Sequence, residues 1–312
     1  MALKHRHLID INEYSVDEVM EILDTARSFA EVNSRAIKKL PTLRGRTIIN
    51  LFLENSTRTR TSFEIAAKRM SADAINFSAS TSSTQKGESL ADTAATLNAM
   101  NADLVVVRSK HGGAPRILTR HMDCHIVNGG DGKHQHPTQA LLDAFTIREK
   151  LGSIEGKTVG IVGDVSHSRV VGSLVPLLNM LGAKPILIAP PTLMPARPDV
   201  LGAQACNNLD DVLPELDVCY MLRIQLERMD AAPLPSLREY AMLYGLNAER
   251  IAKMKPEAVI MHPGPVNRGV ELSSDAADCD RALILNQVNS GVAVRMAVMY
   301  LLLGGDNSGL AS

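Results

Sequence analysis

Residues 46–70, RTIINLFLENSTRTRTSFEIAAKRM, contain the pattern that decides the fold. The run from Arg46 to Leu53 is mostly apolar, with Ile48, Ile49 and Leu51 to Leu53, which predicts a buried strand. Phe63 begins a series of apolar residues at i, i+3, i+4 and i+7, which predicts an amphipathic helix. A buried strand that leads through a short polar turn into a helix is the unit from which parallel α/β sheets are built.

The same strand-then-helix pattern recurs along the chain. Short apolar runs are each followed by polar or glycine-rich sequence, which favours mostly parallel sheets with helices on their faces. The other predicted strands are residues 74–77, 104–107, 125–127, 158–162, 184–189, 217–222 and 258–261.

Two domains are expected. A chain of 312 residues is long enough for two cores, and the glycine-containing stretch 152–156 interrupts the pattern. We predict two three-layer α/β/α domains, residues 1–150 and 151–289, joined by interdomain helices. A nearly all-apolar helix from about Ser290 to Leu303 should be buried. We expect residues 290–312 to pack back onto the first domain.

Composition excludes several classes of protein. The net charge of −1 gives no overall field for nucleic acid or an anionic membrane, so an anion site would have to be local. The first ten residues lack the apolar core of a secretory signal, and Val292–Leu303 is too short to span a bilayer. The four cysteines lack zinc-site spacing, which favours buried, reduced thiols, and we expect a cytoplasmic protein without a metal site.

The polar turn after the first strand is the strongest candidate site. Ser56-Thr57-Arg58-Thr59-Arg60 places three hydroxyls and two guanidinium groups at a helix start, where free N–H groups and the helix dipole favour an anion. These donors suit a phosphate group. A simple Ser or Thr helix cap with surface arginines is the alternative, but it accounts for only one hydroxyl.

These residues resemble a motif of the aspartate/ornithine carbamoyltransferase family, and further matches follow in the family's order over nearly the whole chain. They are Ser82 to Thr93 (SSTQKGESLADT), Val107-Arg108, His136-Pro137-Thr138-Gln139 and His262-Pro263-Gly264-Pro265. The resemblance implies transfer of a carbamoyl group from carbamoyl phosphate to an amino acid, with no cofactor. In the aspartate branch this is an early step of pyrimidine biosynthesis.

The resemblance also implies a role for each matched residue. Donors aimed at the carbonyl oxygen would stabilise the oxyanion formed when an amine attacks, and one such donor is typically worth about 3–4 kcal/mol. His136 is expected to act as such a donor rather than as a general base. The implied carbamoyl phosphate ligands are Ser56, Thr57, Arg58, Thr59, Arg108, His136, Gln139, Gly264 and Pro265; the implied catalytic residues are Arg58, Thr59, Arg108, His136 and Lys86.

Ser82 and Lys86 are implied to reach the site of a neighbouring subunit, so the family pattern predicts a homotrimer with shared active sites. Gln85 stands where some relatives carry a second lysine, which removes one positive charge near the phosphate. For Lys86, the alternative is an ordinary solvated loop lysine. A separate regulatory chain or a dihydroorotase partner is known among relatives, and the sequence does not distinguish these from a bare trimer.

The second substrate is inferred from the second half of the chain. Arginine suits bidentate carboxylate binding, and in the aspartate branch the residues matching Lys86, Arg169, Arg223 and Gln225 hold the two carboxylates. For Arg223, pairing with Glu227 on the surface is the alternative. The H-P-G-P turn favours the aspartate branch, since the ornithine branch has H-C-L-P there; ornithine or another amino acid is the second choice.

Two other classes of function fit the sequence less well. Gly160-Ile161-Val162-Gly163-Asp164 suggests a dinucleotide-binding turn, but the full G-x-G-x-x-G pattern is absent. A phosphate-binding regulatory module without catalysis would not need Arg108, His136 and Gln139 together with the anion site. The sequence therefore favours an enzyme.

Overall fold

The computed structural model describes residues 3–33, 35–78, 89–225 and 236–304. The chain divides into two compact units. Unit 1 comprises Met1–Phe145 and Val288–Ser312, and unit 2 comprises Thr146–Gln287. The chain crosses between them within two helices, α5 (Pro137–Leu151) and α11 (Ile284–Leu302).

The sheet of unit 1 has the strand order β2-β1-β3-β4, and all its pairings are parallel. Its strands are β1 (Thr47–Phe52), β2 (Asp73–Ser78), β3 (Leu104–Ser109) and β4 (His125–Asp131). Its other helical segments are η1 (Ile11–Glu13), α1 (Val16–Asn33), α2 (Thr57–Arg69), α3 (Leu90–Ala99) and α4 (Ala114–Leu118).

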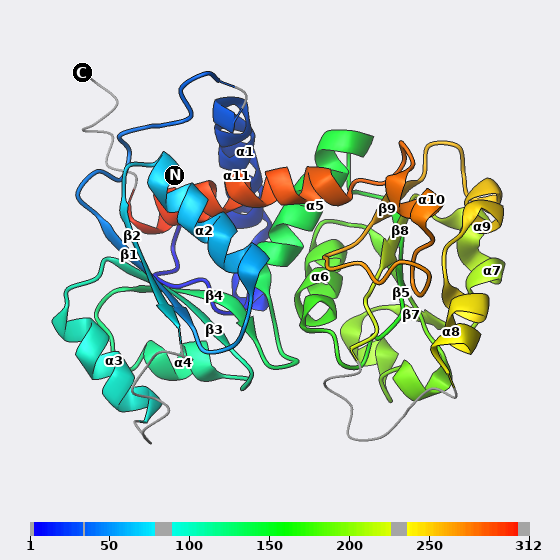
Figure 1. The fold of residues 1–312 in the computed structure, drawn as a ribbon, viewed down its shortest axis with the longest axis horizontal. Coiled ribbons are helices and arrows are strands. Elements are labelled where there is room, and N and C mark those ends of the chain that lie inside the picture. The colour runs from blue at the N-terminus through cyan, green and yellow to red at the C-terminus, as the bar shows by residue number, and fades with distance from the viewer. Residues whose placement is uncertain (1–2, 34, 79–88, 226–235, 305–312) are drawn as a thin grey trace. The chain divides into compact units, whose positions relative to one another are not determined.

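Apolar side chains on both faces of β1 and β3 allow helices to pack on both sides of this sheet. Side chains such as Ile49 and Val105 pack with Leu97 of α3 and Leu118 of α4 in one buried cluster. Successive residues of a strand point to opposite faces, so Ile48 faces the other side. In Figure 1, α3 and α4 lie on one side of the sheet and α2 and α11 on the other. Unit 1 therefore has the expected three layers.

The sheet of unit 2 has the order β7-β6-β5-β8-β9 and is also parallel throughout. Its strands are β5 (Thr158–Val162), β6 (Lys184–Ile188), β7 (Gln204–Cys206), β8 (Val218–Met221) and β9 (Val259–Met261). Its helical segments are α6 (Arg169–Met180), η4 (Pro191–Leu193), η5 (Pro198–Leu201), α7 (Leu209–Val212), η6 (Leu213–Glu215), α8 (Leu237–Tyr244), α9 (Ala248–Lys253) and α10 (Ser274–Asp278). Figure 1 shows α6 on one side of the sheet and α7, α8 and α9 on the other.

The α/β fold class predicted from the sequence is confirmed, and several boundaries differ. Helix α11 begins at Ile284, earlier than the predicted start near Ser290, because Asn286 and Gln287 interrupt the apolar pattern without breaking the helix. Its middle, from Ala293 to Met299, is buried. Cys124 and Cys219 are buried, as expected, but Cys206 and Cys279 are only half-buried.

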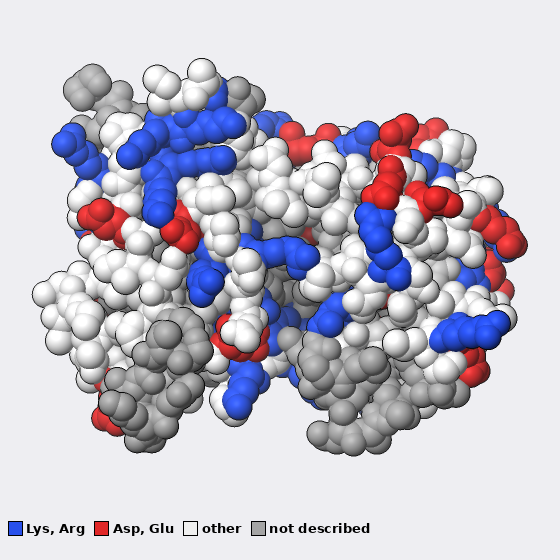
Figure 2. Space-filling view, in the orientation of Figure 1, with Lys and Arg blue, Asp and Glu red and all other residues white. Residues whose placement is uncertain are grey.

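Two general properties follow from the described residues. None of their helices is both long and apolar enough to cross a membrane. Figure 2 shows Lys, Arg, Asp and Glu side chains among uncharged residues on the visible face, with a group of Lys and Arg over the α2 region of unit 1.

Candidate active site

The S-T-R-T-R segment forms the start of α2 at the end of β1. Ser56 is the N-cap residue, with extended backbone, and its side chain makes no capping hydrogen bond to the helix. The simple capping alternative therefore does not describe Ser56. Thr57 and Arg58 are exposed, whereas Thr59 is buried. The first N–H groups of this 13-residue helix face the turn, which is the arrangement that binds anions.

Arg108 lies near the end of β3 and reaches the start of α2. Its Nη1 donates to Thr59 Oγ1 at 3.3 Å and to the Gly129 carbonyl at 3.2 Å. Its Nε donates to Glu54 Oε1 at 2.7 Å. Glu54 follows β1 and was not singled out in the sequence, because its partner lies on a strand more than fifty residues away. Within unit 1, the structure thus brings Arg108 together with the anion motif.

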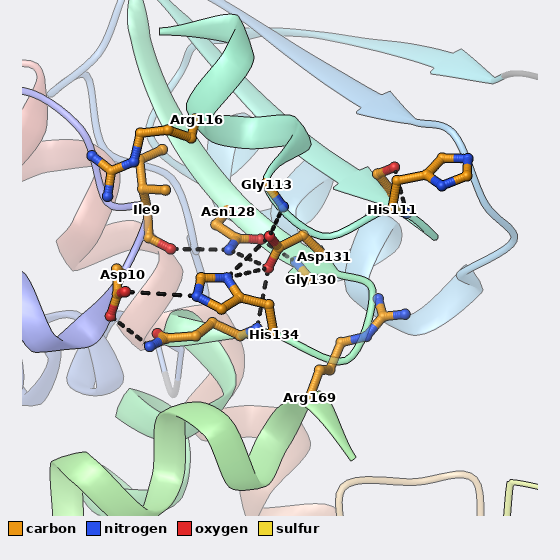
Figure 3. Close-up of polar contacts among 12 residues, drawn as sticks. Ile9, Asp10, His111, Gly113, Arg116, Asn128, Gly130, Asp131, His134 and Arg169 are labelled. Atoms are coloured by element: carbon orange, nitrogen blue, oxygen red, sulfur yellow. Dashed lines mark hydrogen bonds and ion pairs between the residues drawn. The ribbon is translucent and has the colours of Figure 1, made fainter. Parts of the chain in front are cut away.

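His136 lies directly before α5, with its imidazole buried. The loop that leads to it is fixed by the carboxylate of Asp131, which is fully buried. Asp131 accepts hydrogen bonds from Asn128 Nδ2 (2.8 Å), the Gly113 N–H (2.8 Å) and the Gln135 N–H (3.1 Å). Figure 3 shows these contacts converging on Asp131.

The same loop is tied to the N-terminal segment. His134 Nδ1 lies 3.1 Å from Asp131 Oδ2, and its Nε2 lies 3.7 Å from Asp10 Oδ2 (Figure 3). Gln135 Oε1 accepts from the Ile11 N–H at 2.8 Å. The approach to His136 is therefore held by polar contacts from several segments, as a preorganised donor requires.

Gln139 lies in the first turn of α5 and is buried. Its Nε2 donates to Asp143 Oδ1 at 3.1 Å, one helical turn further on. Asp143 is fully buried and was not identified from the sequence, although its i, i+4 spacing from Gln139 was available as a signal.

In unit 2, Asp164 connects the two segments that carry the predicted carboxylate ligands. It follows β5, and its Oδ1 accepts from the His167 N–H at 3.2 Å and lies 2.7 Å from His167 Nδ1. Its Oδ2 accepts from the Gln225 N–H at 3.3 Å. Arg169 is the first residue of α6, and Arg223 follows the end of β8. Asp164 thus links the loop before Arg169 to the segment of Arg223 and Gln225.

The H-P-G-P turn of unit 2 follows β9. The Gly264 N–H donates to His262 Nδ1 at 2.8 Å, so the imidazole carries its proton on Nε2. That nitrogen lies 3.2 Å from Glu271 Oε1, which also accepts from the Asn267 N–H at 2.5 Å. Gly264 has a φ of +68°, which favours glycine, and the Gly264–Pro265 peptide is cis. The hydrogen bonds from Gly264 to His262 and from Asn267 to Glu271 hold this turn in place.

Some predicted site residues lie where the structure is not described. Ser82 and Lys86 lie outside the described residues. Glu227, the alternative partner of Arg223, also lies outside them. Across the described ranges, no group of three or more His, Cys, Asp or Glu residues could hold a metal ion.

Unit 1 thus holds hydroxyl, guanidinium and backbone donors at the carboxyl ends of parallel strands, and unit 2 places arginines at its own strand ends. This defines an α/β protein of two units built to bind anions, because ligands of such folds bind at the carboxyl ends of the strands. The chain belongs to the aspartate/ornithine carbamoyltransferase family. The family's carbamoyl-P binding domain matches residues 6–149, and its Asp/Orn binding domain matches residues 155–302.

Individual relatives agree with this assignment. The chain is 55% identical over 306 residues to the aspartate carbamoyltransferase catalytic subunit of Syntrophotalea carbinolica, with 98% of each chain covered. It is 57% identical over 300 residues to that of Thermobifida fusca, with 96% of each covered.

Solved structures are similar over nearly the full length. Aspartate transcarbamoylase of Trypanosoma cruzi in complex with N-(phosphonacetyl)-L-aspartic acid matches with a TM-score of 0.85 and 34% identity over 94% of each chain. Ornithine carbamoyltransferase of Pyrococcus furiosus matches with a TM-score of 0.86 and 27% identity, over 98% of this chain and 99% of that one.

Proposed function

We propose that this chain is an aspartate carbamoyltransferase, which transfers the carbamoyl group of carbamoyl phosphate to the amino group of L-aspartate and releases phosphate. The observation that carries this proposal is the Arg108–Thr59 hydrogen bond, because it joins a strand-end cation to the anion motif at the start of α2. The relatives from Syntrophotalea carbinolica and Thermobifida fusca, at 55% and 57% identity, are aspartate carbamoyltransferase catalytic subunits, which favours aspartate over ornithine as the acceptor.

The donor substrate is assigned to unit 1. The phosphate would bind Ser56, Thr57, Arg58 and Thr59 at the start of α2, where N–H groups and guanidinium donors favour a dianion. The carbonyl oxygen would accept from Arg108, Thr59 and His136, and the carbamoyl NH2 would donate to Gln139. Gly264 and Pro265 of unit 2 would contact the carbamoyl group or the attacking amine.

The chemistry then follows from charge. Attack of the aspartate amine places negative charge on the carbonyl oxygen, and fixed donors stabilise that charge as it forms. The C–O bond to phosphate breaks, and the departing phosphate accepts the proton that the amine loses. In this scheme His136 is a hydrogen-bond donor to the oxyanion. Neither a metal nor a redox cofactor takes part in any step.

The acceptor substrate is assigned to unit 2, with Lys86 as an additional ligand. Arg169, Arg223 and Gln225 would hold the two carboxylates of aspartate, together with Lys86. We further propose that Ser82 and Lys86 act on a neighbouring subunit within a homotrimer in the cytoplasm. A regulatory chain or a dihydroorotase would be a further partner of this assembly.

One assay tests the activity directly. Phosphate release is measured with carbamoyl phosphate and a panel containing aspartate, ornithine and glutamate. Release with aspartate alone is expected. Release with ornithine in place of aspartate, or none with any acceptor at saturating concentrations, would overturn the assignment. The mass of the purified particle, measured in parallel, tests the trimer.

A further inference from the structure

A buried carboxylate on α5 lies beside the side-chain amide of Gln139. Asp143 is fully buried on α5, and its Oδ1 accepts from Gln139 Nε2 at 3.1 Å. A carboxylate has only acceptors to offer, whereas the two ends of a glutamine amide differ, one being a donor and one an acceptor. The NH2 end of Gln139 must therefore face Asp143, and its Oε1 is the end directed away.

Arg295 of α11 supplies the charge that opposes Asp143. Burial lowers the pKa of Arg295 to about 10, and the negative charge of Asp143 acts in the opposite direction. The guanidinium thus remains protonated at neutral pH although it is buried. A buried carboxylate without an opposing charge is costly, so the two groups stabilise each other within unit 1.

Arg295 also connects this pair to the helix that carries the anion motif. Its Nη1 donates to Ser62 Oγ of α2 at 2.7 Å, and its Cζ lies 4.9 Å from the centre of the Phe63 ring. A Cβ at Gly291, one turn earlier on α11, would lie only 2.5 Å from that Nη1. Gly291 therefore leaves the space in which Arg295 reaches α2.

We infer that Asp143, opposed by Arg295, fixes Gln139 as a hydrogen-bond acceptor and thereby determines the chemical class of donor substrate that unit 1 takes. The inference rests on the proposed function, in which Gln139 meets the carbamoyl NH2. A carbamoyl group presents N–H donors at that position, whereas an acetyl group presents a methyl. Asp143 is a positioning residue, because it acts through Gln139.

The test compares two donors of nearly the same shape. KM for carbamoyl phosphate is measured with aspartate as acceptor, and acetyl phosphate is measured as a competitive inhibitor. In Asp143→Asn the new amide can donate to Gln139 Oε1, which permits the reversed orientation with Nε2 toward the substrate. KM for carbamoyl phosphate should rise about 10-fold, as expected for one mispaired hydrogen bond, while Ki for acetyl phosphate changes less than about twofold.

Control variants separate orientation from general damage. Gln139→Ala should produce the same loss of discrimination, and adding Asp143→Asn to it should change the KM to Ki ratio no further. Arg295→Met, which removes the opposing charge, should shift the ratio in the same direction as Asp143→Asn. Equal changes for both ligands in Asp143→Asn, or an additive effect in the double variant, would overturn the inference.

A measurement on the wild-type protein keeps the inference testable if these variants do not fold. Neutron diffraction from deuterium-exchanged crystals should locate deuterons on the Gln139 atom that faces Asp143. Finding the carbonyl oxygen there instead would overturn it. Absence of phosphate release by the wild type with aspartate would reject the proposed function, and the neutron result would still decide the amide orientation.

Discussion

Arg108 is held by Glu54 across the neighbouring strands β1 and β3, with Nε donating to Oε1 at 2.7 Å. The side chains of both residues are mostly buried, at 14% and 19% exposure. This contact leaves Nη1 of the same guanidinium to donate to Thr59. Glu54 thus fixes the direction in which Arg108 presents its remaining donors.

Glu54→Gln should therefore reduce kcat. The neutral amide weakens a charge-assisted hydrogen bond, and loss of about 1–2 kcal/mol of positioning corresponds to a roughly 10-fold decrease. Glu64→Gln is the matched control, because Glu64 pairs with the exposed Lys68 on α2. Steady-state phosphate release is the measurement. Equal kcat values for the wild type and Glu54→Gln would show that Arg108 needs no help from Glu54.

Arg58→Ala should almost abolish turnover. The exposed guanidinium of Arg58 at the start of α2 is assigned to the phosphate, and removal of one such donor to a developing charge costs roughly 100- to 1,000-fold in kcat. Lys68→Ala, near the other end of the same helix, should leave kcat within about twofold. Turnover of Arg58→Ala at the wild-type rate would refute the assignment of the anion site.

Much of this arrangement could be predicted from local sequence. Strand β5 occupies the predicted residues, Thr158–Val162, because an apolar run bounded by polar residues is a local signal. Strand β4 extends to Asp131, well beyond the predicted Val127, because its glycines suggested a loop. A Cβ at Gly129 would lie 3.2 Å from the Val107 carbonyl, so the residue is glycine because strand β3 is close.

At the candidate site, too, only residues in local motifs could be predicted. Motif residues such as Arg58 and His136 stand in short, recognisable strings. Glu54 and Arg295 act through partners far away in the chain, and no local pattern reports such pairs. Their contribution depends on which strands and helices become neighbours, and that information is in the tertiary structure alone.

Sharing of sites between subunits makes a prediction about mixtures. Arg58→Ala and Lys86→Ala are each expected to be inactive as pure proteins, because each lacks one part of every site. After subunit exchange, a hybrid trimer would contain some sites with both residues intact, so partial activity should return. Exchange is followed by mass spectrometry of differently labelled subunits. Persistent inactivity despite demonstrated exchange would show that Lys86 does not act on a neighbour.

Arg223→Ala should mainly weaken the aspartate dependence. The concentration of aspartate at half-maximal rate should rise about 10- to 100-fold, as expected for losing a charged hydrogen-bonding partner, while KM for carbamoyl phosphate changes little. Arg197→Ala, which removes an exposed arginine of unit 2 that pairs with Asp199, is the control. An unchanged aspartate dependence would place the acceptor site elsewhere.

His7 should make the stability of the protein depend on pH. Burial, reinforced by the charge of Arg6, lowers the pKa of His7 from 6.5 to about 4, and its Nδ1 accepts from the Ile126 N–H at 3.1 Å. Between pH 4 and pH 6.5, His7 of the unfolded chain binds a proton that His7 of the folded chain does not. The free energy of unfolding should therefore fall as the pH decreases from 6.5 to 4, and this contribution should be complete below pH 4.

The expected loss from His7 is about 1–2 kcal/mol, after allowance for its partial exposure to solvent. Urea unfolding at pH 7 and pH 5 measures it. His7→Gln cannot titrate and should show a smaller decrease between the two pH values, whereas His121→Gln, which replaces an exposed histidine, should behave like the wild type. If His7→Gln and the wild type lost the same free energy over this interval, a different group would have to account for the pH dependence.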